Sequence, residues 1–549
     1  MSRTKKSARR GTRTDETTAD SNKKQRKEVK KTVISSTATS VAVNDAKGSH
    51  QWAENTLTKL LGGMSLDTFE SKYFEKKPLH VRKVDKSVLF SSGLFSRKKM
   101  LKIMENEPRS MSFGKDLMVC RYINSERENF DGKDSNGHAT SRQVANLLDK
   151  GFSCQFYQPQ RYVDGLYEIN AAFEEVFGGL AGASAYLTPA NSQALAPHYD
   201  DVEVFVLQTQ GCKKWKLYHP LVELAGEHSS DLAVDQLGEP WMELTVEEGD
   251  LLYFPRGVVH QACTDKEHFS THVTISVYQH NTWANFLEVA LPRVIRQAFD
   301  SDIAFRKGLP FRYLSYMGTQ FPPDSAKAKG FTATFKKLVG QLAAHIGDKD
   351  IQEASDVAAL DMLANRLPPP RETNADKSGP SPLDENVVIR FKNRSHIRLS
   401  MGEDETKEAF VAVYYSQHNC RRHHMGLCTC DGGDEDRKED AEDDDSDDAD
   451  ENAESDSADR DPDDDGGNES DGEEDDLVSA FGQLPPQPKS IVFPGDLASA
   501  LMKLYALSAS TTHGAPIDEL AEVASNEAAV HGMLLRLWSE DLLDVSPQL

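Results

Sequence analysis

The chain has 549 residues and a formal net charge of −25, which is enough length for two or three domains with a large core. Its seven cysteines are unevenly spaced, which indicates a reducing compartment rather than a disulfide framework. No run of apolar residues is long enough to span a bilayer, so we expect no membrane partner.

Residues 1–49 are predicted to be a disordered basic tail. The first 31 residues contain 12 Lys and Arg against four acids, with almost no large apolar side chain. The tail lacks the apolar region of a secretory signal. Clustered basic residues of this kind indicate an address to the nucleus or nucleolus, or a nonspecific RNA contact, and nothing beyond this tail favours direct nucleic-acid binding.

Between residues 50 and 285 the pattern predicts two helices and then a β-barrel. Residues 53–61 and 66–76 are expected to be helical, the first ended by a pair of glycines. Strand-like segments then alternate with loops. A helix over residues 166–177 is expected to pack on the outside of the barrel.

Two segments of this barrel have the pattern of a metal site. His198 and Asp200 stand two residues apart, and in an extended strand such side chains project from the same face. Gly249-Asp250 is typical of a turn, and a second turn at Pro255–Gly257 places His260 on the strand that follows. Two His and one carboxylate leave the opposite side of the metal open, as a non-heme Fe(II) oxygenase needs. A His-x-Asp triplet alone often arises by chance, but the turns that follow favour the metal site.

The segment from Tyr186 to Trp283 resembles the JmjC-type 2-oxoglutarate oxygenases, and within them the ribosomal oxygenases. The resemblance is carried by Tyr186–Pro189, Asn191–Gln193, His198–Tyr218 and Tyr278–Trp283. It implies an α+β fold with a double-stranded β-helix (jelly-roll or cupin) barrel, a helical dimerisation region and a winged-helix-like C-terminal domain. It covers most of the chain from about residue 50 to the end, apart from an acidic insert.

The resemblance also implies a function. Fe(II) would be held by His198, Asp200 and His260, with 2-oxoglutarate and O₂ as co-substrates. The expected reaction is hydroxylation of a histidine in a ribosomal protein, demethylation of a methyl-lysine of histone H3, or both, with a role in chromatin and transcription regulation. The alternative is a non-catalytic cupin-like scaffold or adaptor for chromatin or ribosome assembly. Such proteins usually lose a metal ligand or the co-substrate lysine, and here all are present.

Lys213 occupies the position at which this family binds the distal carboxylate of 2-oxoglutarate. Strand alternation gives Lys213, Trp215 and Leu217 one face and Lys214 the other. Lys213 would then be partly desolvated and would need an anion, because an unpaired buried ammonium is costly. An ordinary surface lysine is the alternative.

Ser276 and Tyr186 are further candidates for binding the co-substrate. Ser276 shares one strand face with His272, Thr274 and Tyr278. This polar stripe would face the barrel interior if the family alignment holds, because small barrels line their lumen from one face of each strand. Otherwise it is the outer face of a half-solvated strand.

After the barrel, residues 286–375 are predicted to be helical. Two apolar stripes recur at helical spacing. They are formed by Phe331, Phe335, Leu338, Leu342 and Ile346, and by Val357, Leu360, Leu363, Ala364 and Leu367. Such stripes are usually core, but they match the family's dimerisation region, so we expect a homodimer.

Residues 382–549 are predicted to form the winged-helix-like domain. Strands are expected at 387–391 and 410–415, and helices near 496–506, 517–523 and 528–538. The last helix contains only His531 and Arg536 as basic residues, so we interpret the domain as a structural or protein-contact module.

An acidic insert interrupts this domain. Residues 431–476 contain 27 Asp and Glu against three Lys and Arg, a net charge of −24 that leaves −1 for the rest of the chain. The insert is expected to be disordered, either binding basic proteins or acting as a solvated loop. The adjoining run from Cys420 to Cys430 lacks the second cysteine pair of a zinc site, so a flexible loop is expected there.

Overall fold

The computed structural model describes residues 50–84, 94–107, 110–124, 126–370, 379–404, 406–426, 488–509, 514–524 and 526–548. The predicted basic tail, the acidic insert and the end of the Cys420–Cys430 run lie outside these residues. Within the described ranges, no helix combines the length and apolar character that crossing a membrane requires.

Two helices precede the first strand, α1 (Gln51–Leu60) and α2 (Leu66–Lys72). Gly62 follows α1 with φ +68°, so the glycines end this helix as predicted. The second helix is shorter than predicted, because Glu75 adopts a left-handed backbone with φ 55° that an α-helix does not accommodate. Phe69 of α2 packs edge-on against Tyr253, at 4.9 Å between ring centres.

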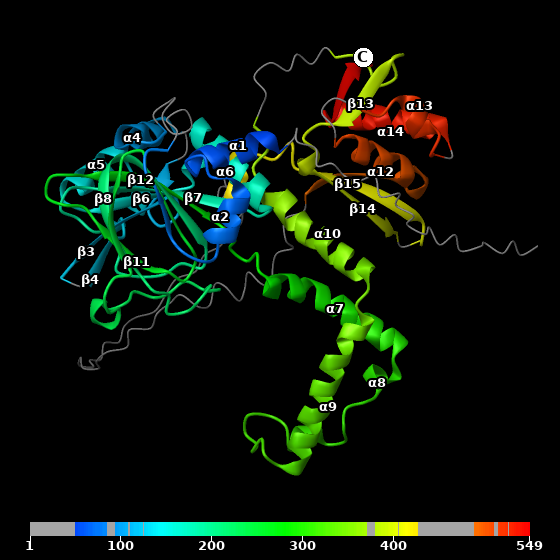
Figure 1. The fold of residues 1–549 in the computed structure, drawn as a ribbon, viewed down its shortest axis with the longest axis horizontal. Coiled ribbons are helices and arrows are strands. Elements are labelled where there is room, and N and C mark those ends of the chain that lie inside the picture. Colours follow the sequence, from blue (N-terminus) through cyan, green and yellow to red (C-terminus); the bar gives the residue numbers. More distant parts are fainter. Residues whose placement is uncertain are drawn as a thin grey trace, which may run out of the picture. The chain divides into compact units, whose positions relative to one another are not determined.

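Ten strands form the predicted barrel region (Figure 1), in the hydrogen-bonded order β1-β10-β8-β12-β7-β6-β3-β4, with β9 and β11 paired to β8. All the pairings between these strands are antiparallel. The strands are β1 (Leu79–Val81), β3 (Leu117–Ile123), β4 (Glu126–Phe130), β6 (Ser153–Tyr157), β7 (Ala181–Thr188), β8 (Glu203–Tyr218), β9 (Met242–Glu247), β10 (Leu251–Phe254), β11 (Val259–Cys263) and β12 (Ser270–Val277).

The long strand β8 belongs to two parts of this sheet. Its first half pairs with β10 and β12, and its second half, from Cys212 onward, pairs with β9 and β11. Gly211 lies at the change, with φ +65°, and a Cβ atom there would lie 2.0 Å from the carbonyl oxygen of Phe269. Glycine permits this approach, and the bend carries the Lys213 end of β8 to the strand that bears His260.

Helices and a small two-stranded sheet cover the barrel sheet. They are α4 (Arg97–Asn106), α5 (Ser141–Asp149), α6 (Asp164–Phe177), and the short strands β2 (Met111–Ser112) and β5 (His138–Ala139). The helix α6 ends at Phe177, as predicted, and Gly178 follows it in a left-handed conformation. Its side chains Phe173 and Ile169 join the apolar core of the barrel, which confirms the packing expected for this helix.

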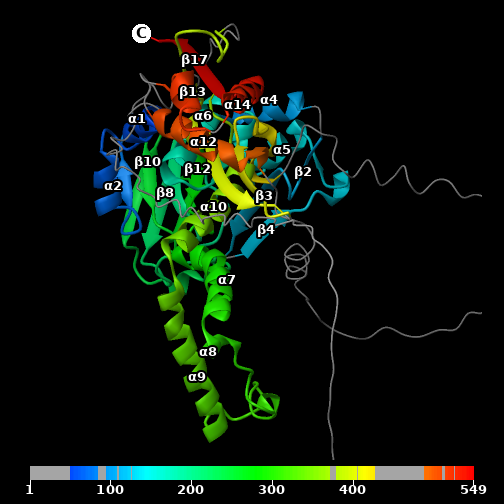
Figure 2. The ribbon, with the colours of Figure 1, turned by 90° about the vertical axis from the view of Figure 1, so that its right-hand side faces the viewer.

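Helices follow the barrel, as predicted: α7 (Trp283–Ser301), α8 (Ile303–Arg306), α9 (Ala326–Leu342) and α10 (Asp348–Asn365). Figure 2 shows α8 and α9 below α7. The predicted stripe on α9 is not a core face in this chain, because Phe335 is 61% exposed and Ile346 lies beyond the end of the helix.

The C-terminal region has its own apolar core, distinct from that of the barrel. Two small antiparallel sheets, β13-β17 and β14-β15-β16, pack with three helices. The elements are β13 (Val387–Phe391), β14 (Ile397–Glu403), β15 (Ala409–Tyr415), β16 (Lys489–Pro494), α12 (Ala498–Leu507), α13 (Ile517–Ala521), α14 (Glu527–Ser539) and β17 (Leu543–Pro547). The predicted strands and helices of this region are therefore confirmed to within a few residues.

The segment before the acidic insert packs against the barrel. Arg421–Gly426 forms a short 3₁₀ helix, and the His424 side chain is fully buried. Its Nε2 lies 2.7 Å from Glu174 Oε1 and its Nδ1 lies 2.8 Å from Gln160 Nε2. The expectation of a flexible loop is wrong for residues 420–426, because buried partners on α6 and beside it hold this histidine.

Candidate metal centre

His198 and His260 face each other across a single antiparallel bridge. The amide of His198 donates to the carbonyl of His260 at 3.1 Å, and the amide of His260 donates back at 2.8 Å. The prediction of an extended strand through Asp200 is therefore wrong, since β8 begins only after it. His260 lies on β11, as predicted.

Backbone contacts fix Asp200 without a strand. Its carbonyl accepts a hydrogen bond from the amide of Gly257 at 2.9 Å, and the preceding Tyr199 amide donates to Ser229 Oγ at 3.0 Å. Gly257 has φ +83°, and a Cβ atom there would lie 2.2 Å from the carbonyl oxygen of Val222. The Pro-x-Gly turn thus holds the segment that carries the carboxylate, because only glycine fits there.

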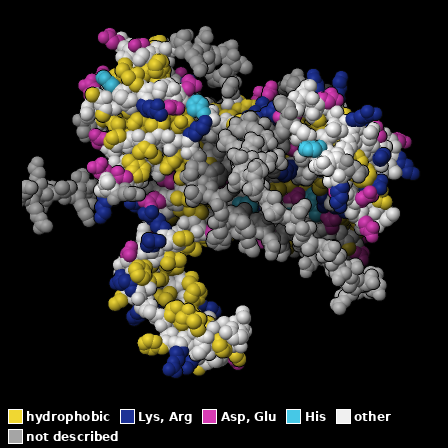
Figure 3. Space-filling model, turned by 180° about the vertical axis from the view of Figure 1, so that it is seen from behind, with side chains coloured by type: hydrophobic (Ala, Val, Ile, Leu, Met, Phe, Trp, Pro, Cys, Tyr) yellow, Lys and Arg dark blue, Asp and Glu magenta, His cyan; other side chains and the backbone are white. Residues whose placement is uncertain are grey.

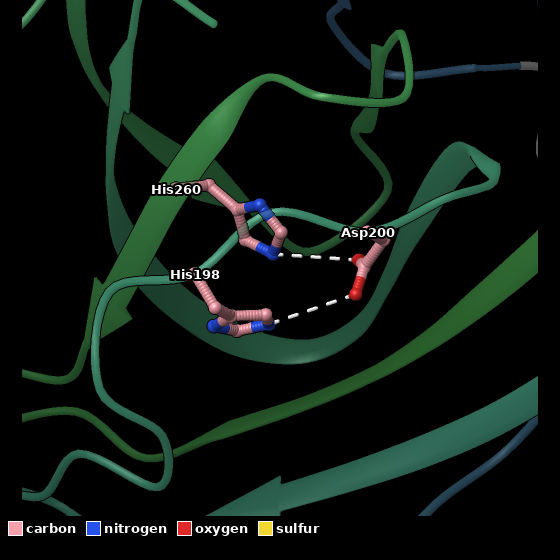
Figure 4. A group of neighbouring side chains, drawn as sticks. All are labelled: His198, Asp200 and His260. Carbon is pink, nitrogen blue, oxygen red and sulfur yellow. Dashed lines mark ion pairs between the residues drawn. The ribbon is translucent and has the colours of Figure 1, made fainter. Parts of the chain in front are cut away.

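The three predicted donors converge (Figure 4). Nε2 of His198 lies 3.8 Å from Oδ1 of Asp200, and Nε2 of His260 lies 3.7 Å from Oδ2. All three donor atoms lie within 4.8 Å of one another. This spacing accommodates an ion at the distance of about 2.1 Å that is typical of histidine ligation.

Both imidazole rings are oriented by their other nitrogen. Nδ1 of His198 lies 2.8 Å from the carbonyl oxygen of Ala196, and Nδ1 of His260 lies 3.1 Å from that of Val258. A carbonyl only accepts, so each Nδ1 bears the proton and each Nε2 presents its lone pair toward Asp200. Burial, and then the nearby His198, lower the pKa of His260 to about 4, so this ring is neutral near pH 7.

The donors open onto a cavity of about 50 Å³ inside the barrel. Lys213 lines it and is only 4% exposed, which confirms the predicted alternation, since Lys214 is exposed. Burial lowers the pKa of Lys213 to about 8. Its ammonium lies 5.9 Å from the ring centre of Tyr186 and 5.8 Å from that of Trp215. Among the described residues no carboxylate forms an ion pair with it, so this cation has an unfilled requirement for an anion.

Of the two further candidates for binding the co-substrate, Tyr186 lines the cavity and Ser276 does not. Burial raises the pKa of the Tyr186 phenol, so it stays protonated as a donor. On β12 the lining residues are His272 and Thr274, which share the strand face of Ser276. Alternation identified this face, but not which of its members lie at the cavity.

One other group among the described residues has donor atoms close enough for a metal: Cys212, Asp265 and His268. Here Asp265 already accepts from His268 Nδ1 at 2.8 Å, and its other oxygen lies 3.6 Å from the ammonium of Lys214. Burial raises the pKa of Cys212, which disfavours the thiolate that binds metals. We therefore assign the metal centre to the barrel cavity alone.

Comparison with known proteins agrees with this geometry. The JmjC domain family matches residues 155–286, which include all three donors and Lys213. Ribosomal oxygenase 2 of Rattus norvegicus is 37% identical over 380 residues, which cover 67% of this chain and 78% of that relative. The chain belongs to the JmjC-domain ribosomal oxygenase family. The family predicted from Tyr186–Trp283 is thus confirmed, as is a JmjC cupin-like α+β fold.

With two other relatives, the alignment covers a smaller share of the relative's own length. Ribosomal oxygenase 1 of Homo sapiens is 38% identical over 332 residues, 60% of this chain and 50% of that protein. The bifunctional lysine-specific demethylase and histidyl-hydroxylase NO66 of Culex quinquefasciatus is 35% identical over 384 residues, 66% of this chain and 56% of that protein. The chain therefore spans about half the length of these two curated relatives.

Proposed function

We propose that the chain is an Fe(II)- and 2-oxoglutarate-dependent dioxygenase that acts on proteins. One observation carries the proposal: two imidazoles and a carboxylate with oriented lone pairs open onto the cavity that also holds the unpaired ammonium of Lys213. A metal ion with an open side would bind to the three donors, and a dicarboxylate co-substrate would pair with the ammonium.

The residues present fit these two groups. His198, Asp200 and His260 would hold Fe(II), since two nitrogens and one oxygen are its typical donors in oxygenases. Lys213 would bind the distal carboxylate, and Tyr186, which lines the same cavity, would donate its hydroxyl to it. When bound, the iron supplies the oxidising chemistry by which O₂ and 2-oxoglutarate yield succinate, CO₂ and an oxygenated product.

The activity is tested by incubating the full chain with Fe(II), O₂ and 2-oxoglutarate and measuring succinate. We expect slow turnover without a protein substrate and faster turnover with one. Absence of succinate in both assays, with 2-oxoglutarate still bound, would favour the alternative of a non-catalytic scaffold or adaptor.

For the substrate, we propose a histidine of a ribosomal protein, a methyl-lysine of histone H3, or both. The names of the relatives support this range, since two are ribosomal oxygenases and one is a demethylase and histidyl-hydroxylase. Mass spectrometry of ribosomal proteins and histone tails after incubation distinguishes them: hydroxylation adds oxygen to histidine, whereas demethylation removes a methyl group and releases formaldehyde.

We further propose a homodimer formed through the helices after the barrel. Large apolar side chains there are exposed, including Phe311, Leu314, Phe335 and Val339. Figure 3 shows hydrophobic side chains mixed with basic ones on the segment with α8 and α9, at the bottom of the view. Exposed apolar surface of this kind is typical of a protein interface. Sedimentation velocity, with Phe335→Glu as the disrupting variant, tests the dimer.

The remaining features of the family stay as proposals too. We propose a barrel domain over residues 50–285, a dimerisation region over 286–375 and a winged-helix-like domain over 382–549, the last supported by three helices packed with two small sheets. The basic residues of the 1–49 tail support location in the nucleus or nucleolus, with a role in chromatin and transcription. Imaging the full chain against one without this tail tests the location.

A further inference from the structure

His272 is a cavity residue whose ring is fixed by aromatic contacts. It lies on β12, is 2% exposed and lines the same cavity as Lys213. Its ring stacks on Tyr186 with ring centres 4.8 Å apart and planes 7° apart, and it meets Trp215 edge-on at 5.6 Å. These ring contacts hold the imidazole in place.

One polar atom of this ring is not satisfied by the residues that the structure describes. Nδ1 is buried and has no hydrogen-bond partner among the described residues. A buried polar atom without a partner costs free energy, and nearly all such atoms in folded proteins have one. A phenylalanine would make the same stacking contacts without this cost. The imidazole nitrogen is therefore explained by a partner that enters the cavity.

The charge of the ring restricts what that partner is. Burial, and then the charge of Lys213, lower the pKa of His272 well below its ordinary value, so the ring is neutral. A neutral imidazole keeps one N–H and adds no second positive charge to the cavity. Lys213 and His272 thus offer the cavity one cation and one directional neutral donor, and both side chains lie against the rings of Tyr186 and Trp215. A carboxylate, with two oxygens, is the chemical group that uses both.

We propose that His272 is a positioning residue for the co-substrate, donating a hydrogen bond to the carboxylate that Lys213 neutralises. The inference rests on the proposed function, because it takes 2-oxoglutarate as the ligand. Lys213 supplies the charge that makes binding strong, and His272 fixes the direction in which the carboxylate lies. The stack on Tyr186 sets the ring at the required angle, so the two side chains act as one rigid wall of the cavity.

Two substitutions separate hydrogen bonding from stacking. His272→Phe keeps an aromatic ring against Tyr186 but has no donor, whereas His272→Asn keeps a donor near the Nδ1 position and loses the stack. His268→Phe, on the exposed loop before β12, is the control for the same change of residue type outside the cavity. Circular dichroism and thermal unfolding establish that each variant is folded.

The measurement is the affinity of the full chain, loaded with Mn²⁺ and free of oxygen, for two ligands by calorimetry. One ligand is 2-oxoglutarate and the other is 2-oxopentanoate, which has a methyl group in place of the distal carboxylate. We expect His272→Phe to weaken 2-oxoglutarate about tenfold, the value of one hydrogen bond to a charged group, and to leave 2-oxopentanoate unchanged. His272→Asn should stay within about threefold of the unsubstituted chain. In turnover, His272→Phe should raise KM for 2-oxoglutarate with kcat nearly constant.

Two results would overturn the inference: unchanged 2-oxoglutarate affinity in His272→Phe, or an equal loss for both ligands. If the phenylalanine variant does not fold, His272→Asn against His272→Ala decides, since only the asparagine variant should keep the affinity. Failure of the proposed function looks different, because the unsubstituted chain itself would then bind no 2-oxoglutarate or form no succinate.

Discussion

Two clusters of buried side chains differ in whether the protein itself pairs their charges. Beside α6, buried acidic side chains are paired with basic side chains and amides from later segments of the chain. Glu174 is bonded to His424 and accepts from the amide of Leu367 at 2.9 Å, while Arg366 donates to Glu175 at 2.9 Å. We call these residues the α6 joint. It ties two later segments of the chain to the helix that covers the barrel.

The barrel cavity is the opposite case. Lys213 is as deeply buried as the α6 joint, but within the described ranges no carboxylate pairs with it and the Nδ1 atom of His272 has no hydrogen-bond partner. Buried charges that are paired within the chain stabilise a fold, whereas unpaired ones lower stability and persist for a ligand. The difference separates a structural cluster from a functional one. It also predicts opposite responses to substitution: loss of stability at the joint, and loss of binding in the cavity.

The largest effect is expected from the metal donors. His198→Ala or His260→Ala should abolish iron-dependent succinate formation, because each removes one of three donors. The fold should survive, since the backbone bridge between these residues does not involve the side chains. Succinate formation and thermal unfolding are measured together. Full activity in either variant would refute the ligand assignment.

Lys213→Met should have opposite effects on binding and stability. The 2-oxoglutarate requirement should rise by on the order of 30-fold or more, because the carboxylate loses its charged partner. The free energy of unfolding at pH 7 should rise by up to about 3 kcal/mol. The buried ammonium has a pKa of about 8, below its ordinary value, so its cost is fully present below pH 8.

Lys214→Met is the matched control, since Lys214 is exposed. This substitution should change the 2-oxoglutarate requirement and the free energy of unfolding by only a small fraction. If Lys214→Met weakens 2-oxoglutarate and Lys213→Met does not, the assignment of the two strand faces is inverted.

At the α6 joint the expectation is reversed. Glu174→Ala leaves His424 and the Leu367 amide buried without an acceptor, so it should lower the free energy of unfolding by about 3 kcal/mol. Glu174→Gln, which keeps one acceptor, should cost less. Chemical denaturation gives the stability, and KM for 2-oxoglutarate should not change while the chain is folded. A changed KM with normal stability would contradict the structural role.

The sequence predicted much of the centre because its evidence is local. Alternation placed Lys213 on the buried face, and the Pro-x-Gly turn placed His260 on a strand. It was wrong where long-range contacts decide. Asp200 is held by the amide of Gly257 rather than by a strand, and His424 is held by Glu174, 250 residues away. His272 was seen only as one member of a polar stripe, because its role depends on what surrounds the ring.

The pH dependence of 2-oxoglutarate binding tests whether the charge of Lys213 acts on a ligand rather than within the fold. Because the carboxylate needs the protonated form of Lys213, the dissociation constant of 2-oxoglutarate should be flat below pH 8 and rise about tenfold per pH unit above it. Lys213→Met should remove this dependence. The measurement is calorimetry over a pH series with the Mn²⁺-loaded chain. A flat profile in the unsubstituted chain would show that Lys213 is not the titrating partner.

The smallest effect is expected from His50, at the solvent edge of the α6 joint. Its Nδ1 pairs with Glu175 Oε1, and this hydrogen bond raises the pKa of His50 above 6.5. Burial would raise the pKa of Glu175, but the hydrogen bond from His50 and the charge of Arg366 hold it at about 2. A raised histidine pKa means that the stabilisation is fully present below pH 6.5 and is lost as pH rises through the higher value.

The histidine is nearly half exposed, so His50→Ala should cost at most about 1 kcal/mol at about pH 5.5 and almost nothing at about pH 9. His50→Gln, which keeps a donor without a charge, should show less of this pH dependence. An equal cost of His50→Ala at both pH values would show that the contact stabilises the joint through packing and not through charge.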